Sequence, residues 1–244
     1  MLNCWSIFAE EGVSDELVMY VAAMSAQLLD NDEDGSVDDP DLEYASGIYE
    51  GNIALFVEEG NDAMEHWDEY GDGGAVLFVS EINPSGIKWE DATFEEVIHN
   101  INAIQEQHLY PAEIGHSPDL PVPSELRLAM DIARGGYFED VPNNYPADAW
   151  YTYDDETCDY HGCQLTEYLY WGIGTYLGYF EDDDICDSLS QEWKICSASE
   201  LQQIDEKLYA IVTNPKLKFP SQKPDDKYCP APTPGIIYNI IHSL

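Results

Sequence analysis

Apolar residues recur at helical spacing in several segments of the chain. Ser14 has the chemistry of a helix N-cap, and Leu17, Val21, Met24 and Leu28 lie on one face of the turns after it. The pattern therefore predicts a helix from Ser14 to about Leu29. The same spacing predicts further helices over residues 62–70, 93–108, 124–134, 165–180 and 199–212. A capping box, Thr93 with Glu96 three residues later, is expected to open the second of these.

Two short apolar runs, Ile53–Val57 and Ala75–Val79, have the length and the Gly and acidic flanks of buried strands. The segment from Leu109 to Pro123 is rich in Pro and Gly and is predicted to be loop. The chain after Thr213 is rich in Pro and is expected to wrap the surface. These elements predict an α+β fold, a mostly helical single domain with a small sheet.

The predicted elements fall into three consecutive parts of one domain. Residues 1–45 contain a helix and an acidic loop, and residues 46–110 contain the sheet and the helix after it. Residues 111–244 form a helical part that holds most of the cysteines and ends in the Pro-rich tail. A chain of 244 residues is long enough to bury a substantial core.

Composition indicates a folded protein with an extreme negative charge. The chain is 44% hydrophobic and carries 49 acidic residues against 9 basic ones, a net charge of −40. Residues 1–87 contain 21 acidic residues and no Lys or Arg. Nucleic acids and anionic membranes require positive charge on a protein, so both are excluded as partners. The charge indicates either a salty or calcium-rich medium, such as seawater, or simply a solubilising surface.

Six cysteines, five of them after residue 157, predict a disulfide-stapled C-terminal region in an oxidising compartment. Local pairs Cys158–Cys163 and Cys186–Cys196 are favoured, although spacing alone leaves the connectivity open. The absence of a CxxC pair disfavours a zinc ribbon. No apolar run approaches the ~18 residues of a membrane span, and no leader is visible. The cysteines favour a secreted or extracellular protein whose leader has been removed.

The acidic run from Asp30 to Asp41 places oxygen ligands at the spacing of an EF-hand-type calcium loop. Positions 1, 3, 5, 7, 9 and 12 of such a loop are occupied by Asp30, Asp32, Asp34, Ser36 (through its carbonyl), Asp38 and Asp41. Gly35 falls at position 6, where the chain turns sharply, and Val37 at position 8 is the apolar anchor. Calcium is a hard cation that prefers such oxygen ligands. The alternative is a solvated acidic turn.

The loop departs from a sensor EF-hand in ways that favour a structural site over a switch. Position 12 is Asp, as in dockerin-type loops, and the chain has only one such loop. Pro40 is also incompatible with a normal exiting helix that begins before about residue 41. We therefore expect a constitutively bound calcium ion.

Glu95-Glu-Val-Ile-His99 resembles the HExxH motif of zincin metallopeptidases, with Glu in place of the first His. In that motif, positions 1 and 5 lie one helical turn apart and bind one metal ion, while position 2 activates a water. The resemblance implies Glu95 and His99 as ligands and Glu96 as the general base. A solvated acidic helix face would produce the same pattern.

Glu167 is the only charged residue in the otherwise apolar segment 165–180, so its side chain is expected to be buried. A buried carboxylate must be protonated, accept a hydrogen bond or bind a cation. In zincins with a Glu ligand, a downstream helix supplies that third ligand, and Glu167 matches this role. The alternative is a Glu held by Tyr hydroxyls or by Arg127 or Arg134. Such a site would take Zn²⁺ or another divalent transition metal.

Other residues are assigned more generally. Additional ligands could come from Asp154, Asp155 and His161, and an oxyanion donor from Tyr151, Tyr153 or Tyr160. Surface or packing roles are expected for His66, His108, His116 and His242, and an ion pair is expected for Asp131 with Arg134. The chain lacks a nucleophile elbow, a P-loop and a GxGxxG motif.

The chain as a whole resembles an uncharacterised group of acidic marine proteins. The likeness lies in residues 29–35, 95–99, 130–136, 154–158 and 166–171 and implies one domain without a known activity. From the residues we predict a calcium-binding, zincin-like, metal-dependent hydrolase that acts on peptides or proteins. The alternative is a non-enzymatic extracellular calcium-binding protein with a degenerate zincin-like site.

Overall fold

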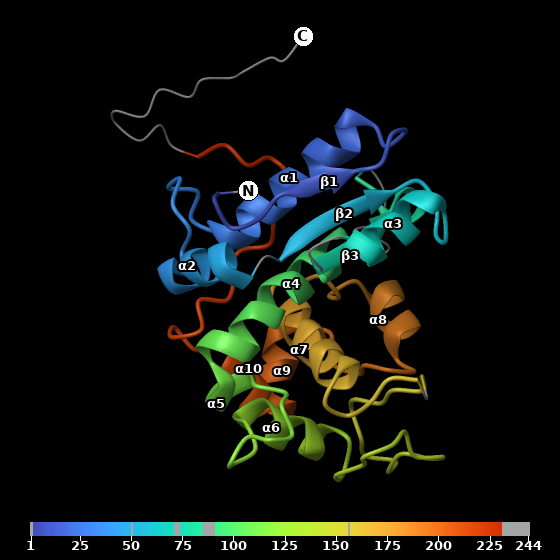
Figure 1. Ribbon diagram of the computed structural model, residues 1–244. Helices are drawn as coiled ribbons and strands as arrows, with labels where there is room; N and C mark the ends of the chain where they lie inside the picture. Colours follow the sequence, from blue (N-terminus) through green and yellow to red (C-terminus); the bar gives the residue numbers. More distant parts are fainter. Residues whose placement is uncertain (1, 50, 71–73, 85–90, 156, 231–244) are drawn as a thin grey trace.

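A small parallel sheet lies at one end of the molecule and most of the helices lie at the other (Figure 1). The computed structural model describes residues 2–49, 51–70, 74–84, 91–155 and 157–230. The predicted α+β class, mostly helical with a small sheet, is confirmed. One continuous hydrophobic core contains residues from Cys4 to Leu217, so the sheet and the helices share it.

The sheet has the order β1-β2-β3 and all three strands are parallel. Strands β2 (Asn52–Phe56) and β3 (Gly74–Phe78) confirm the two predicted apolar runs, shifted by one residue. Strand β1 (Ile7–Ala9) is not evident from the sequence, because it has only 3 residues and is partly exposed. Gly74 has a φ of 107°, and a Cβ there would lie 1.9 Å from the Asn52 carbonyl oxygen. Glycine is therefore required where β3 begins.

Helix α1 (Asp15–Leu29) begins as predicted, since the Ser14 hydroxyl accepts a hydrogen bond from the Leu17 N–H. It leads into the acidic loop, after which α2 (Pro40–Tyr49) has Pro40 at its first position, where a missing N–H costs nothing. Helix α3 (Asp62–Tyr70) has its predicted bounds. The short helix η1 (Val79–Glu81) comes directly after β3.

Helix α4 (Thr93–Ile104) connects the two ends of the molecule, because it contacts β2 and β3 as well as α7 (Cys163–Tyr176) (Figure 1). The predicted capping box at Thr93 is wrong. Thr93 is already helical, and both its N–H and its hydroxyl donate to Asp91 Oδ1. A π-helical turn, η3 (Gln105–Leu109), extends α4.

The remaining helices of the described chain come after η3, and at least three of them contact α7. They are α5 (Pro111–Ile114), α6 (Glu125–Ala133), α8 (Asp183–Leu189), α9 (Ala198–Ile204) and α10 (Glu206–Val212). Helix α5 lies in the segment predicted to be loop. The single helix predicted over 199–212 is two helices, because Asp205 ends α9 and its side chain caps α10 by accepting from the Leu208 N–H. No helix in the described part of the chain is long and apolar enough to cross a membrane.

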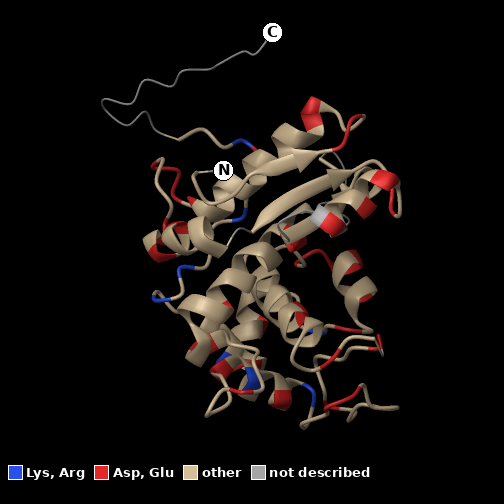
Figure 2. Cartoon of the chain, in the orientation of Figure 1, with Lys and Arg blue, Asp and Glu red and all other residues tan. Residues whose placement is uncertain are grey.

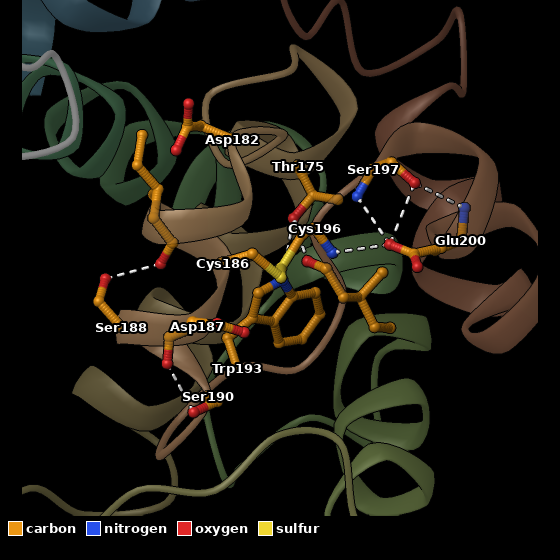
Figure 3. The surroundings of a disulfide bond; sticks show 12 residues. Thr175, Asp182, Cys186, Asp187, Ser188, Ser190, Trp193, Cys196, Ser197 and Glu200 are labelled. Atoms are coloured by element: carbon orange, nitrogen blue, oxygen red, sulfur yellow. Dashed lines mark hydrogen bonds between the residues drawn. A yellow bond between two sulfur atoms is a disulfide. The ribbon is translucent and has the colours of Figure 1, made fainter.

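Both predicted disulfides, Cys158–Cys163 and Cys186–Cys196, are present in the C-terminal region. Figure 3 shows the second, which closes the segment that contains Trp193. The Trp193 indole donates to the Thr175 hydroxyl of α7 at 2.9 Å and so anchors that segment in the core. Acidic residues occur over all parts of the chain, whereas Lys and Arg occur in few places (Figure 2).

Candidate metal centre

Helix α4 carries a stripe of polar side chains toward the interior of the molecule. Glu95, His99, Asn102 and Glu106 succeed one another at intervals of four, three and four residues, so they lie on one face of the helix and its π-helical extension. The neighbouring Ile98 is fully buried in the core. Burial of polar groups is unfavourable unless each has a partner. The presence of these polar side chains in the interior is therefore better explained by a functional role than by a contribution to stability.

Three of the predicted second-site residues converge in space, and the fourth, Glu167, approaches one of them. Glu95, Glu96 and His99 each offer a ligand atom, and the three atoms lie within 4.8 Å of one another. The Nε2 atom of His99 lies 3.8 Å from the Oε1 atom of Glu167, which belongs to α7. Ligands that are about 2.0–2.2 Å from one zinc ion lie at most about 4.4 Å apart. Glu95, Glu96 and His99 thus have nearly the spacing that a single ion requires, whereas Glu167 is outside this group of three and would have to move closer to Glu95 and Glu96 to share the ion.

No Lys or Arg among the described residues pairs with these carboxylates. Arg127 donates to the Ser117 carbonyl, and Arg134 donates to the Phe138 carbonyl and the Tyr145 hydroxyl. The alternative in which an arginine holds Glu167 is therefore wrong. The predicted ion pair of Arg134 with Asp131 is also not formed, since Asp131 instead accepts from the Tyr160 hydroxyl.

Burial keeps Glu167 and His99 uncharged at neutral pH when no metal is bound, whereas Glu95 and Glu96 are partly ionised. Burial, with help from neighbouring carboxylates, raises the pKa of Glu95 to about 7, of Glu96 to about 7 and of Glu167 to about 9. Burial, and to a lesser extent His116, lowers the pKa of His99 to about 4. The contact between His99 and Glu167 is therefore a contact of two neutral groups, with the imidazole lone pair available to a metal ion.

Glu192 is a further carboxyl of the cluster that no sequence pattern marks. It contributes to the raised pKa of both Glu95 and Glu167, and burial raises its own pKa. The Trp171 indole donates to Glu192 Oε1 at 2.9 Å. Glu192 lies in the segment closed by the disulfide between Cys186 and Cys196. The fold alone brings that segment to α7, so local spacing gives no signal for it.

A pocket of about 290 Å³ opens on one side of the cluster. Glu96 and His99 line it, together with Thr166 of α7, whereas Glu95 and Glu167 do not. Glu96 thus lies between the cluster and the pocket. The Nε2 atom of His99 is buried and has no hydrogen-bond partner among the described residues. An imidazole nitrogen without a hydrogen-bond partner, close to several carboxyl groups, fits a metal ligand. Because this site has one histidine and several carboxylates, it suits a harder divalent ion than a site with two histidines does.

The acidic loop forms a second cluster. Asp30, Asp32 and Asp38 each place a carboxylate oxygen within 4.8 Å of the others. Gly35 has the positive φ, 90°, expected at position 6. Asp34 lies outside this group and accepts from the Ser36 N–H, and Asp41 is exposed at the start of α2. The structure therefore groups three of the five predicted carboxylates.

The C-terminal segment after α10 lies against the acidic loop. The Tyr228 hydroxyl donates to Asp30 Oδ2 at 2.6 Å, and Asn31 Oδ1 accepts from the N–H groups of Ser221 and Gln222. Burial, and after it the neighbouring aspartates, raises the pKa of Asp38. Negative charge on Asp38 is therefore unfavourable without a cation.

The remaining predicted site residues lie outside the ligand cluster. Tyr151 and Tyr160 use their hydroxyls elsewhere, on the Gln164 carbonyl and on Asp131, so neither is placed as an oxyanion donor. The Tyr153 pKa is raised by burial and then by Glu167 and Glu192, which places this ring near the cluster. Neither Asp154 nor Asp155 belongs to the group that could hold a metal, and Asp155 accepts from Thr157.

The predicted surface and packing roles of the histidines hold only in part. The ring of His108 stacks on Tyr49, and His66 is exposed. His116, however, is buried, lies at 2.5 Å from Glu106 and lines the same pocket as His99. The Nδ1 atom of His161 lies 2.9 Å from the His116 carbonyl oxygen, and His161 is not among the clustered ligands. His242 lies outside the described residues.

Comparison of the chain with protein-family models, with curated proteins and with solved structures finds no match. No relative therefore suggests a function, and the function must be inferred from the arrangement of residues within the chain itself.

Proposed function

We propose that the protein is a metal-dependent hydrolase with a zincin-like site, in which Glu95, His99 and Glu167 bind a divalent transition metal. The orphaned Nε2 atom of His99, 3.8 Å from Glu167 Oε1, is the observation that carries this proposal. A divalent ion would satisfy this nitrogen and compensate the buried carboxylates at once. When bound, such an ion polarises a carbonyl and lowers the pKa of a coordinated water.

Glu96 is the proposed general base. Its pKa is raised by burial to about 7, which is near the value that suits proton transfer at neutral pH. Its side chain borders the pocket beside His99, so a substrate and an attacking water can both reach it. Glu95 and Glu167 do not line the pocket, in keeping with ligand roles behind the reacting groups.

The acidic loop is proposed as a structural calcium site that holds Asp30, Asp32 and Asp38 together and retains the C-terminal segment. An extracellular location would supply both calcium and the oxidising conditions that the two disulfides need. The competing function is a non-enzymatic calcium-binding protein. The same acidic loop supports this alternative. In that case the buried carboxyl groups of α4 and α7 would be protonated and would have no catalytic role.

Hydrolysis of a mixed peptide library by the metal-loaded protein tests the proposal. Glu96→Gln is expected to retain the metal and to lower the rate of hydrolysis by roughly a hundredfold or more, because it removes the base. Glu59→Gln, a matched change of an exposed loop carboxylate, is expected to leave the rate unchanged. No hydrolysis by the wild-type protein with its transition metal bound would favour the non-enzymatic alternative.

A further inference from the structure

The pocket beside the cluster is lined by more unsatisfied polar atoms than His99 alone supplies. Both polar atoms of the Asn102 side chain, Oδ1 and Nδ2, are buried and have no hydrogen-bond partner in the described parts of the chain, and Asn102 is 2% exposed. The Nε2 atom of His116 is buried and unpartnered in the same way. All three residues line the same pocket. Unpaired buried groups destabilise a fold, so their concentration around one pocket indicates a ligand.

His116 is held in a defined orientation. Its Nδ1 atom lies 2.5 Å from Glu106 Oε2, and Glu106 projects from the π-helical turn at the end of α4. This is a close N···O contact without hydrogen-bond geometry, since Glu106 Oε2 has no hydrogen-bond partner among the described residues. Short π-helical segments are frequent at functional sites, and this one places Glu106 behind His116.

The chemistry of these groups selects the ligand. The Asn102 amide offers one acceptor and one donor side by side, and the His116 Nε2 atom donates or accepts according to the tautomer of the ring. An anionic ligand would be repelled by Glu96 and Glu106, which also line the pocket. An amine or a metal ion would leave the Asn102 Nδ2–H₂ group without an acceptor. A neutral amide satisfies both polar atoms of the Asn102 side chain, since its carbonyl accepts from the Nδ2–H₂ group and its N–H donates to Oδ1.

We propose that this pocket binds an amide group of the substrate, with Asn102 donating to its carbonyl and accepting from its N–H, and with His116 beside the bound amide. The proposal rests on the proposed function and names its substrate class as peptides. It assigns Asn102 and His116 as substrate-binding residues and Glu106 as the residue that positions His116. A second hollow of about 450 Å³ shares Glu106 and His116 with the pocket, which favours an extended peptide over a small free carboxamide.

Calorimetric titration of the full-length protein with N-acetyl-dialanine amide tests the proposal, with cleavage monitored by chromatography of the same samples. The capped dipeptide is uncharged, so the net charge of −40 does not dominate the result. We expect binding that weakens by roughly tenfold or more when an ester oxygen replaces the central N–H, because the acceptor in the protein is then left unpaired. Acetamide, which is too short to reach the second hollow, is expected to bind more weakly than the dipeptide.

Asn102→Leu keeps the approximate shape of the side chain and removes its polar atoms. We expect this variant to lose roughly tenfold or more in affinity for the dipeptide while its melting temperature does not fall, since it deletes unsatisfied groups. Asn100→Leu is the control for stability, because Asn100 Nδ2 donates to the Gly51 carbonyl at 3.1 Å. Asn100→Leu should therefore lower the melting temperature.

Equal affinity for amide and ester, unchanged binding by Asn102→Leu, or no binding of the dipeptide at millimolar concentration would each overturn the proposal. The ester comparison needs no variant and so decides the question even if Asn102→Leu fails to fold. Tighter binding of acetamide than of the dipeptide would overturn the assignment to peptides. If the protein binds the dipeptide but retains no transition metal, the proposed function alone is contradicted. If the protein retains the metal but does not bind the dipeptide, this inference alone is contradicted.

Discussion

The Nε2 atom of His99 on α4 lies 3.8 Å from the Oε1 atom of Glu167 on α7, and no described lysine or arginine pairs with either group. Burial opposes charge on both residues, because it lowers the pKa of His99 to about 4 and raises that of Glu167 to about 9. Charge on this pair is therefore unfavourable in the metal-free protein. A bound cation would reverse this, since it favours an ionised Glu167 and a neutral His99.

The first prediction concerns the pH dependence of the metal-free protein. Glu167 retains its proton in the folded state up to about pH 9, but its ordinary pKa is 4.5. Between these values the folded state binds more protons than the unfolded state, so the free energy of unfolding falls as the pH rises. Glu95 and Glu96 act in the same direction up to about pH 7. His99 acts in the opposite direction, but only below its ordinary value of 6.5.

Denaturant unfolding of the metal-free protein should therefore show decreasing stability from pH 6.5 to pH 9, with Glu167 contributing at most about 3 kcal/mol. Glu167→Gln should flatten this dependence, because Gln does not titrate. Glu59→Gln, at an exposed position, should behave like the wild type. A wild-type protein whose stability rises across this interval would contradict the burial of an uncompensated Glu167.

The second prediction concerns calcium. A ligand that binds only the folded state at a thousandfold excess over its Kd stabilises it by about 4 kcal/mol. Calcium should raise the melting temperature of the wild type, and Asp30→Ala or Asp38→Ala should remove most of the gain. Asp41→Ala should remove less, because Asp41 lies outside the cluster formed by Asp30, Asp32 and Asp38. Equal melting temperatures of the wild type in calcium and in chelator would exclude the site.

The third prediction concerns salt. The screening length is about 3 Å at 1 M salt, compared with about 10 Å at 0.1 M, so molar NaCl should relieve repulsion among the acidic side chains. The calcium-free protein should melt at a higher temperature in 1 M NaCl than in dilute buffer. A melting temperature that is unchanged or lower would show that repulsion within a chain of charge −40 does not limit its stability.

The elements that the sequence predicts well are those with a local cause. The Ser14 cap, the apolar strand β2 and the nearby cysteine pairs all depend on residues close in the chain. The capping box at Thr93 is a wrong prediction because Asp91, two residues earlier, binds its N–H and hydroxyl. The break at Asp205 has a local cause, its cap on the Leu208 N–H, and distant partners as well, since the Trp150 indole and the Tyr168 hydroxyl both donate to its carboxylate.

The candidate site also contains residues that the sequence marks and residues that only the tertiary structure reveals. Glu95, Glu96, His99 and Glu167 can be found from the sequence because their spacing or their apolar surroundings mark them. Asn102 and Glu106 could also be found, as a continuation of the polar stripe of α4 at helical spacing from His99. His116 and Glu192 could not, because they lie in segments without periodicity that only the tertiary fold brings to α4 and α7.

Elemental analysis of the full-length protein, after incubation with calcium and zinc and removal of unbound ions, tests the central claim most directly. We expect wild-type protein to retain one transition-metal ion per chain in addition to calcium. His99→Ala and Glu167→Gln should lose the transition metal without losing calcium, and Glu96→Gln and Glu59→Gln should retain both. A wild-type protein that retains calcium alone, or a His99→Ala variant that retains zinc as the wild type does, would contradict the proposed metal centre.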